Sequence, residues 1–172
     1  MIKFGTISTA NITPRALINP CIDEPKAQVM SIAARSKDRA EEFARWHGIS
    51  RVYDSYEEII ADDETNAFYN PLPISMHKEW TIKALRAGKH VLCEKSFASN
   101  AREAKEMEAA GAETGLVLMD AFHYRYHPVF IRAKEIMESG EIGKVERINA
   151  AFHVPVSDPD NIRMNYNLGG GV

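Results

Sequence analysis

The sequence predicts an α/β fold: a Rossmann-type, doubly wound parallel sheet, followed by the beginning of a second α/β domain with an open sheet that is cut short. Short apolar segments alternate with longer amphipathic segments about six times in about 120 residues, as strands and helices do in such sheets. The later apolar segments have no polar face, as strands covered by helices on both sides require. After residue 121 the pattern changes to one helix and one longer alternating segment.

The order of the predicted elements follows from these segments and from residues that begin or end helices. Strands are expected at residues 2–7, 29–34, 51–53, 67–69, 90–93 and 116–119. Helices are expected at residues 11–18, 37–47, 55–61, 75–87 and 99–114. Pro14 is tolerated in the opening turn of the first helix, and Gly48 and Gly88 suit the left-handed conformation that closes a helix. Ser55 and Glu58 have the spacing of a capping box.

The remaining residues predict the start of a different sheet. A helix is expected at residues 128–139, where Gly140 ends it, and a strand at residues 145–154. In that strand apolar and polar residues alternate, which is typical of a sheet with one covered face. We therefore place a domain boundary between residues 122 and 123, with an incomplete second domain over residues 123–172.

Composition and charge exclude several classes of protein. The chain has 172 residues, of which 45% are hydrophobic and 26% charged, as in ordinary globular proteins. A net charge of −3 predicts no nucleic-acid partner, and no apolar segment approaches the roughly 20 residues of a membrane span. Cys21 and Cys93 are far apart and the N-terminal segment is too short for a secretory signal, so we expect a cytoplasmic protein with reduced thiols.

The loop after the first strand is the first place to look for a ligand, because open α/β sheets bind ligands beyond the carboxyl ends of their strands. Ser8, Ala10 and Thr13 stand here in place of the three glycines of the dinucleotide fingerprint. Small residues still allow a pyrophosphate to approach the backbone, and the N–H groups at a helix start favour an anion. An ordinary strand-to-helix turn with Asn11 as the cap is an equally good interpretation.

The end of the second strand indicates which dinucleotide would fit. An acid about 20 residues beyond the fingerprint usually bonds the ribose hydroxyls of NAD, but the chain has Arg35 and Ser36 in this region. Both suit a 2′-phosphate, because a guanidinium binds phosphate through paired hydrogen bonds. The alternative is a solvated charged segment that opens a helix. We predict that NADP(H) is preferred and that NAD(H) is possible.

Several segments together resemble one protein family over the whole chain. Residues 69–77 read YNPLPISMH, residues 87–95 read AGKHVLCEK and residues 120–128 read DAFHYRYHP. Residues 161–164 read NIRM and are followed by LGGG at residues 168–171. With the first turn, these segments resemble the glucose–fructose oxidoreductase, inositol dehydrogenase and MocA family, most of all the branch containing dimeric dihydrodiol dehydrogenase.

The resemblance implies an NAD(P)-dependent oxidoreductase that passes hydride to or from a sugar, polyol or related carbonyl compound. Residues 1–122 would bind the dinucleotide, and residues 123–172 would begin the domain that binds substrate and makes a homo-oligomer. Lys95 would be catalytic, bonding the reacting oxygen. Tyr124 and Arg125 would line the substrate pocket or pack at the interdomain hinge. The predicted cofactor-binding residues are Ile7, Ser8, Thr9, Ala10, Asn11, Ile12, Arg35, Ser36, Asn70, Pro71, Leu72, Ser75, His77, Glu94 and Lys95.

The chain departs from the family pattern in ways that bear on activity. Ser96 follows Lys95 where the family usually has proline, and Asp120 stands where glutamate is common. The family places a D-x-G-x-H or D-x-G-x-Y element after the glycines, whereas the sequence ends at Val172. We therefore expect the 172-residue chain alone to lack dehydrogenase activity. Alternatives are a module that binds NADP(H) without turnover and, more distantly, another nucleotide-using enzyme such as a methyltransferase.

No metal site is predicted. His123 and His127 have the spacing of two zinc ligands on one face of a helix. Pro128, however, biases His127 away from helical geometry, and no third ligand is near in sequence.

Overall fold

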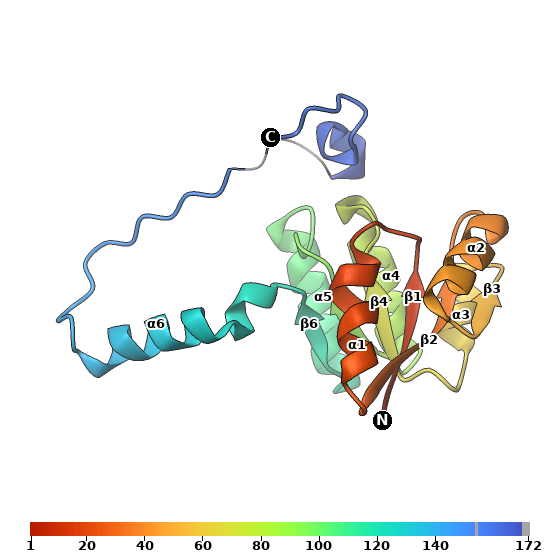
Figure 1. Ribbon diagram of the computed structural model, residues 1–172, viewed down its shortest axis with the longest axis horizontal. Helices are drawn as coiled ribbons and strands as arrows, with labels where there is room; N and C mark the ends of the chain where they lie inside the picture. The colour runs from red at the N-terminus through yellow and green to blue at the C-terminus, as the bar shows by residue number, and fades with distance from the viewer. Residues whose placement is uncertain (154, 170–172) are drawn as a thin grey trace.

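The computed structural model describes residues 1–153 and 155–169. A six-stranded parallel sheet of order β3-β2-β1-β4-β5-β6 forms its centre (Figure 1). The strands are β1 (Ile2–Ile7), β2 (Ala27–Ala33), β3 (Arg51–Tyr53), β4 (Ala67–Asn70), β5 (His90–Cys93) and β6 (Leu118–Asp120). Chain order reverses between β1 and β4, so the switch point at which such sheets bind ligands lies at their carboxyl ends. The predicted Rossmann-type fold is confirmed.

Capping residues set the bounds of the helices between the strands. The helical elements are η1 (Pro14–Ile18), α1 (Asn19–Asp23), α2 (Lys37–His47), α3 (Tyr56–Ala61), α4 (Ile74–Arg86), α5 (Ala101–Thr114), η2 (His123–Tyr126), α6 (Pro128–Ser139), η3 (Ile162–Met164) and η4 (Tyr166–Leu168). The side chains of Ser36, Ser55 and Asn100 accept backbone N–H groups at the starts of α2, α3 and α5. Gly48 and Gly115, both left-handed, end α2 and α5.

Two apolar clusters cover the two faces of the sheet. In the larger cluster, Phe68 of β4 packs with Trp80 of α4 and Met107 of α5. In the smaller cluster, Ile32 of β2 packs with residues of η1 and α2, among them Ala40. Because both faces are covered, β4 is buried along its whole length, which explains why the strand segments lack a polar face.

Several elements begin or end a few residues away from the prediction, among them β2 and α5, and two of the differences have an identifiable reason. The first helix begins at Pro14 and runs to Asp23, and its opening turn is a π-helix in which Asn19 N–H donates to Pro14 O. Pro20 has no N–H to donate, so a regular α-helical ladder is interrupted there. β6 begins two residues later than predicted, because Val117 N–H donates to the side chain of His90 at 3.0 Å.

The strand predicted at residues 145–154 is wrong over residues 145–153, and residue 154 lies outside the described residues. Residues 145–153 form neither strand nor helix, and Figure 1 shows them as an extended trace away from the sheet. A strand needs a neighbouring ladder for its backbone groups, and no described segment supplies one. Alternation determines which face a strand would present, but it does not supply a partner.

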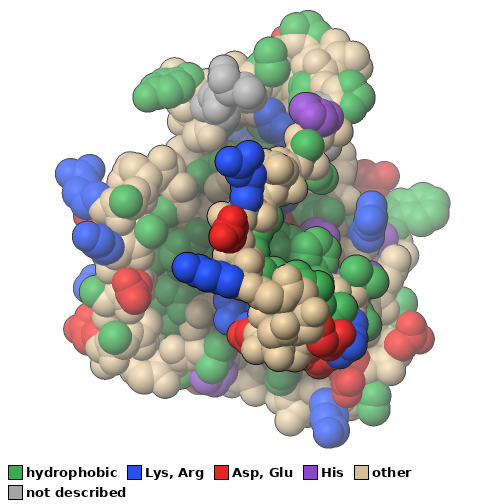
Figure 2. Space-filling model, turned by 90° about the vertical axis from the view of Figure 1, so that its left-hand side faces the viewer, with side chains coloured by type: hydrophobic (Ala, Val, Ile, Leu, Met, Phe, Trp, Pro, Cys, Tyr) green, Lys and Arg blue, Asp and Glu red, His purple; other side chains and the backbone are tan. Residues whose placement is uncertain are grey.

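The chain beyond β6 leaves the sheet and then returns to it. Val129 and Phe130 of α6 are exposed, and Figure 2, viewed from the side on which α6 projects, shows hydrophobic side chains among charged ones. The returning segment meets the start of α4, where a Cβ on Gly169 would lie 2.7 Å from Ile74 Cβ. The close approach and a φ of +80° both require glycine at this position.

No helix in the described ranges is long and apolar enough to cross a membrane.

Candidate functional site

The predicted site residues gather at the carboxyl edge of the sheet, in two halves on either side of the switch point. We call the turns after β1 and β2, residues 8–12 and 35–36, the open half. We call the turns after β4 and β5, residues 69–77 and 93–96, the buried half. The halves differ in exposure: most side chains of the first are reached by solvent, and most polar groups of the second are enclosed.

The first turn of the open half keeps a glycine-type backbone without glycine. Ser8 has a φ of 87°, the one positive value at a non-glycine among the described residues. Its N–H donates to Ala33 O at 2.7 Å, which prolongs the pairing of β1 with β2. Thr13 N–H donates to Ala10 O at 3.0 Å and closes the turn. Thr13, and not Asn11, stands at the helix cap position, so the alternative with Asn11 as the cap is wrong.

The second turn of the open half presents one guanidinium to solvent. Arg35 is exposed, and it lies close enough to Tyr56 to lower the pKa of that phenol against the larger raising effect of burial. Ser36 is committed to the cap of α2, where its Oγ accepts Arg39 N–H at 3.4 Å. Lys37 pairs with Asp54 at 2.6 Å, and this hydrogen bond and charge raise the pKa of Lys37. Of these residues, Arg35 is therefore the one suited to meet an anion.

In the buried half, one amide side chain folds the loop after β4. Asn70 is fully buried and its Nδ2 donates to His77 O and to Thr81 Oγ1, both at 3.2 Å. Its Oδ1 accepts Leu72 N–H at 3.3 Å. Asn70 thus ties the end of β4 to the first turns of α4, and it leaves Pro71 and Leu72 buried between them.

The turn after β5 is held by both oxygens of one carboxylate. Tyr69 Oη donates to Glu94 Oε1 at 2.9 Å, and Lys95 N–H donates to Glu94 Oε2 at 3.1 Å. Glu94 is 8% exposed and Tyr69 fully buried, and burial together with the Glu94 charge raises the pKa of Tyr69. The peptide bond between Lys95 and Ser96 is cis. The Lys95 side chain is exposed at the carboxyl edge of the sheet.

Two further titratable groups complete the buried half and its neighbour β6. His77 is fully buried, with Nε2 2.7 Å from Leu72 O and Nδ1 2.9 Å from Ser96 O. Burial and the Glu94 carboxylate raise the pKa of Asp120, and His77 acts in the opposite direction.

Tyr69 is a residue of the site to which the sequence assigned no role. Its place at the start of the YNPLPISMH segment was a signal, but its contact with Glu94, 25 residues later, is not visible in sequence.

The residues after β6 form an aromatic group outside both halves. The Tyr124 ring lies 4.7 Å from that of Phe122 and 4.8 Å from that of Phe130, and Arg125 is exposed beside them. His127 accepts Val129 N–H at 3.2 Å and caps α6. In the described ranges, no three His, Cys, Asp or Glu residues lie together as a metal site would require.

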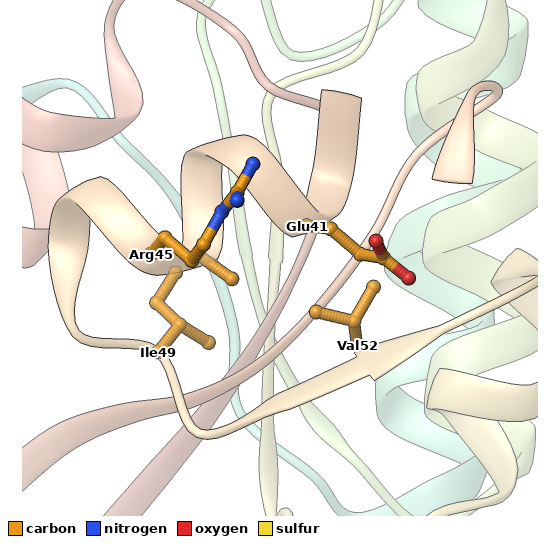
Figure 3. Close-up of a pocket in the computed structure, with 5 residues that line it drawn as sticks. Glu41, Arg45, Ile49 and Val52 are labelled. Carbon is orange, nitrogen blue, oxygen red and sulfur yellow. The ribbon is translucent and has the colours of Figure 1, made fainter. Parts of the chain in front are cut away.

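The hollow drawn in Figure 3 lies away from the site. It has a volume of about 310 Å³ between α2 and β3. Its lining residues are Glu41, Ala44, Arg45, Ile49 and Val52. None of them belongs to the predicted site.

Comparison with known proteins decides the family. Residues 2–122 match the family model described as "Oxidoreductase family, NAD-binding Rossmann fold", that of the glucose–fructose oxidoreductase, inositol dehydrogenase and MocA proteins. The chain belongs to this family. The matched residues carry both halves of the site, and the family resemblance predicted from sequence is confirmed.

Relatives in this family align with nearly the whole chain. The chain is 39% identical to an uncharacterized oxidoreductase from Rhizobium meliloti, over 99% of this chain and 51% of the relative. It is 37% identical to D-xylose 1-dehydrogenase (NADP(+)) 2 from Haloferax volcanii, over 99% and 52%. A crystal structure of KijD10, a 3-ketoreductase from Actinomadura kijaniata with NADP and TDP-benzene, has a TM-score of 0.90 and 35% identity, over 99% and 52%. The chain thus spans about half the length of these relatives.

Proposed function

We propose that the chain is the cofactor-binding part of an oxidoreductase that uses NADP(H) in preference to NAD(H) and acts on a sugar or polyol-like carbonyl compound. The observation that carries the proposal is the exposed Arg35, which stands where proteins that prefer NAD usually have an acid. The neighbouring first turn keeps the glycine-type conformation at Ser8. A bound 2′-phosphate would accept two hydrogen bonds from this guanidinium.

The two halves of the site would hold different parts of the dinucleotide. The backbone of residues 7–12 would meet the pyrophosphate. Arg35 would meet the 2′-phosphate, and Ser36, whose Oγ already accepts Arg39 N–H, would still have its hydroxyl hydrogen to donate to it. The nicotinamide end of the dinucleotide would lie against the buried half. The residues there are Asn70, Pro71, Leu72, Ser75 and His77 in the loop after β4, and Glu94 and Lys95 after β5. Among relatives, D-xylose 1-dehydrogenase (NADP(+)) 2 and the KijD10 structure with bound NADP support the choice of NADP.

Lys95 would act on the substrate and not on the dinucleotide alone. Its ammonium would donate a hydrogen bond to the oxygen on which negative charge develops during hydride transfer. Two features support this role: the side chain is exposed at the carboxyl edge, and Glu94 fixes the turn beneath it. Tyr124 and Arg125, exposed after β6, would then contact the substrate, and the longer protein would be a homo-oligomer.

The test is a titration of the chain with NADPH and with NADH, followed by cofactor fluorescence. We expect NADPH to bind more tightly and Arg35→Ala to weaken NADPH about 10- to 100-fold, because a hydrogen bond to a charged group contributes about 1.5–3 kcal/mol. NADH affinity should change little, since NADH has no 2′-phosphate.

Arg45→Ala is the matched control. Arg45 is an exposed arginine of α2, the helix that follows Arg35 in the chain. It lines the hollow of Figure 3, away from the site. Its removal should leave both affinities unchanged. Equal affinities of the wild-type chain for NADPH and NADH would contradict the choice of cofactor, and binding of neither would contradict the proposed function.

A further inference from the structure

The two ring nitrogens of His77 both face oxygens that can only accept hydrogen bonds. Leu72 O lies 2.7 Å from Nε2 and Ser96 O lies 2.9 Å from Nδ1. Both separations are hydrogen-bond lengths. A neutral imidazole carries one N–H, so in either tautomer one nitrogen lone pair would face a carbonyl lone pair at contact distance. Only a ring with a proton on each nitrogen satisfies both contacts.

We propose that His77 is held as the imidazolium and joins the two turns of the buried half by donating to Leu72 O and to Ser96 O. Leu72 belongs to the loop after β4, and Ser96 directly follows Lys95 in the turn after β5. His77 is therefore a positioning residue: it holds the backbone from which Lys95 projects. The consequence for Lys95 rests on the proposed function, whereas the protonation of the ring does not.

The surroundings supply the negative charge that a buried cation requires. Glu94, at the end of β5, and Asp120, at the end of β6, are both acidic groups of this edge, and Asp120 Oδ1 is buried without a hydrogen-bond partner. Burial and Glu94 raise the pKa of Asp120, and the interaction with His77 opposes that rise, which places the carboxyl of Asp120 within electrostatic reach of the ring.

The other charges near this end of α4 are already neutralised or solvated. Lys78, which follows His77 on α4, pairs with Glu106 of α5 at 3.1 Å. Lys95 is exposed to solvent. Asp120 thus remains as the acidic group that interacts with the ring, and Glu94 interacts with Asp120 in turn.

Nuclear magnetic resonance of the 172-residue chain with ¹⁵N-labelled histidine tests the protonation directly. At about pH 8 an ordinary histidine is neutral. We expect His77 to show two protonated ring nitrogens at this pH, and the exposed His123 and His153 provide reference signals in the same spectrum. The signal is assigned by its loss in His77→Asn. A neutral ring for His77 at about pH 8 would overturn the proposal.

A second measurement separates the charge from the positioning role. Asp120→Asn removes a counter-charge, so the ring should release its proton at a lower pH than in the wild-type chain. Glu113→Gln, which removes an exposed charge at the far end of α5, beside Arg86, should leave the release unchanged. As the ring loses its proton, the amide signals of Ser96 and Phe97 should shift with it. If those signals stay fixed, His77 does not position the turn. Because no cofactor is present, these results are independent of the NADPH titration.

Discussion

The two halves of the candidate site are built in opposite ways. In the buried half, the side chains of Tyr69, Asn70 and His77 are fully enclosed and bond to one another's turns. In the open half, Asn11 and Arg35 are exposed, and the first turn is closed by backbone bonds alone. One half is thus fixed by internal bonds before any ligand arrives, and the other offers backbone N–H groups and a charge to a ligand.

The difference separates stability from recognition within a single site. Changes in the buried half break bonds that hold the fold, because a buried polar group left without a partner costs free energy. In the open half, removal of a side-chain group whose partner would be a ligand should affect affinity and leave stability nearly unchanged, and only changes to the backbone preference should alter stability. If variants of the two halves had the same effect on stability, this separation between the buried half and the open half would be contradicted.

The largest effect is expected in thiol reactivity. Cys93 is fully buried at the end of β5, where burial raises its pKa to about 12, so near pH 8 it is almost entirely the unreactive thiol. Cys21, on α1, is partly exposed. Iodoacetamide followed by mass spectrometry should label Cys93 at least about a thousandfold more slowly than Cys21, because labelling requires the buried half to open. Comparable rates would show that this half opens readily.

The next largest effect is on the free energy of unfolding. Asn70→Ala leaves the N–H of Leu72 and the carbonyl of His77 without their buried partner, so we expect a loss of about 3 kcal/mol in urea unfolding. Asn11→Ala makes the same chemical change in the open half and should cost less than about 0.5 kcal/mol. Similar losses for the two variants would remove the distinction between the halves.

The smallest effect has the opposite sign. Ser8 holds a left-handed backbone that disfavours a side chain, so Ser8→Gly should stabilise the chain by about 1 kcal/mol. Thr9→Gly, one residue later and without positive φ, should instead destabilise it by about 0.5–1 kcal/mol. Thermal and urea unfolding of both variants would measure the difference. A loss of stability in Ser8→Gly would mean that the Ser8 side chain makes a contact worth more than the backbone strain.

The sequence predicted those features whose causes are local. The bounds of the second helix, residues 37–47, and of the fifth strand, residues 90–93, agree with the structure because caps and apolar segments determine them. The extended segment at residues 145–153 was mistaken for a strand because pairing depends on a partner elsewhere in the chain. The enclosure of His77 was equally hidden, since it depends on a carbonyl 19 residues away.

Gly169 packs against Ile74 at the start of α4, and the covalent chain that joins the two residues determines how easily this contact is lost. The segment that carries Gly169 is connected to α6 only through the exposed residues 144–153, so the contact forms within one chain at a high effective concentration. A proteolytic cut after Arg147 would make the same contact bimolecular. The two pieces would then separate on dilution although no atom at Gly169 or Ile74 had changed, because their covalent connection had kept them together.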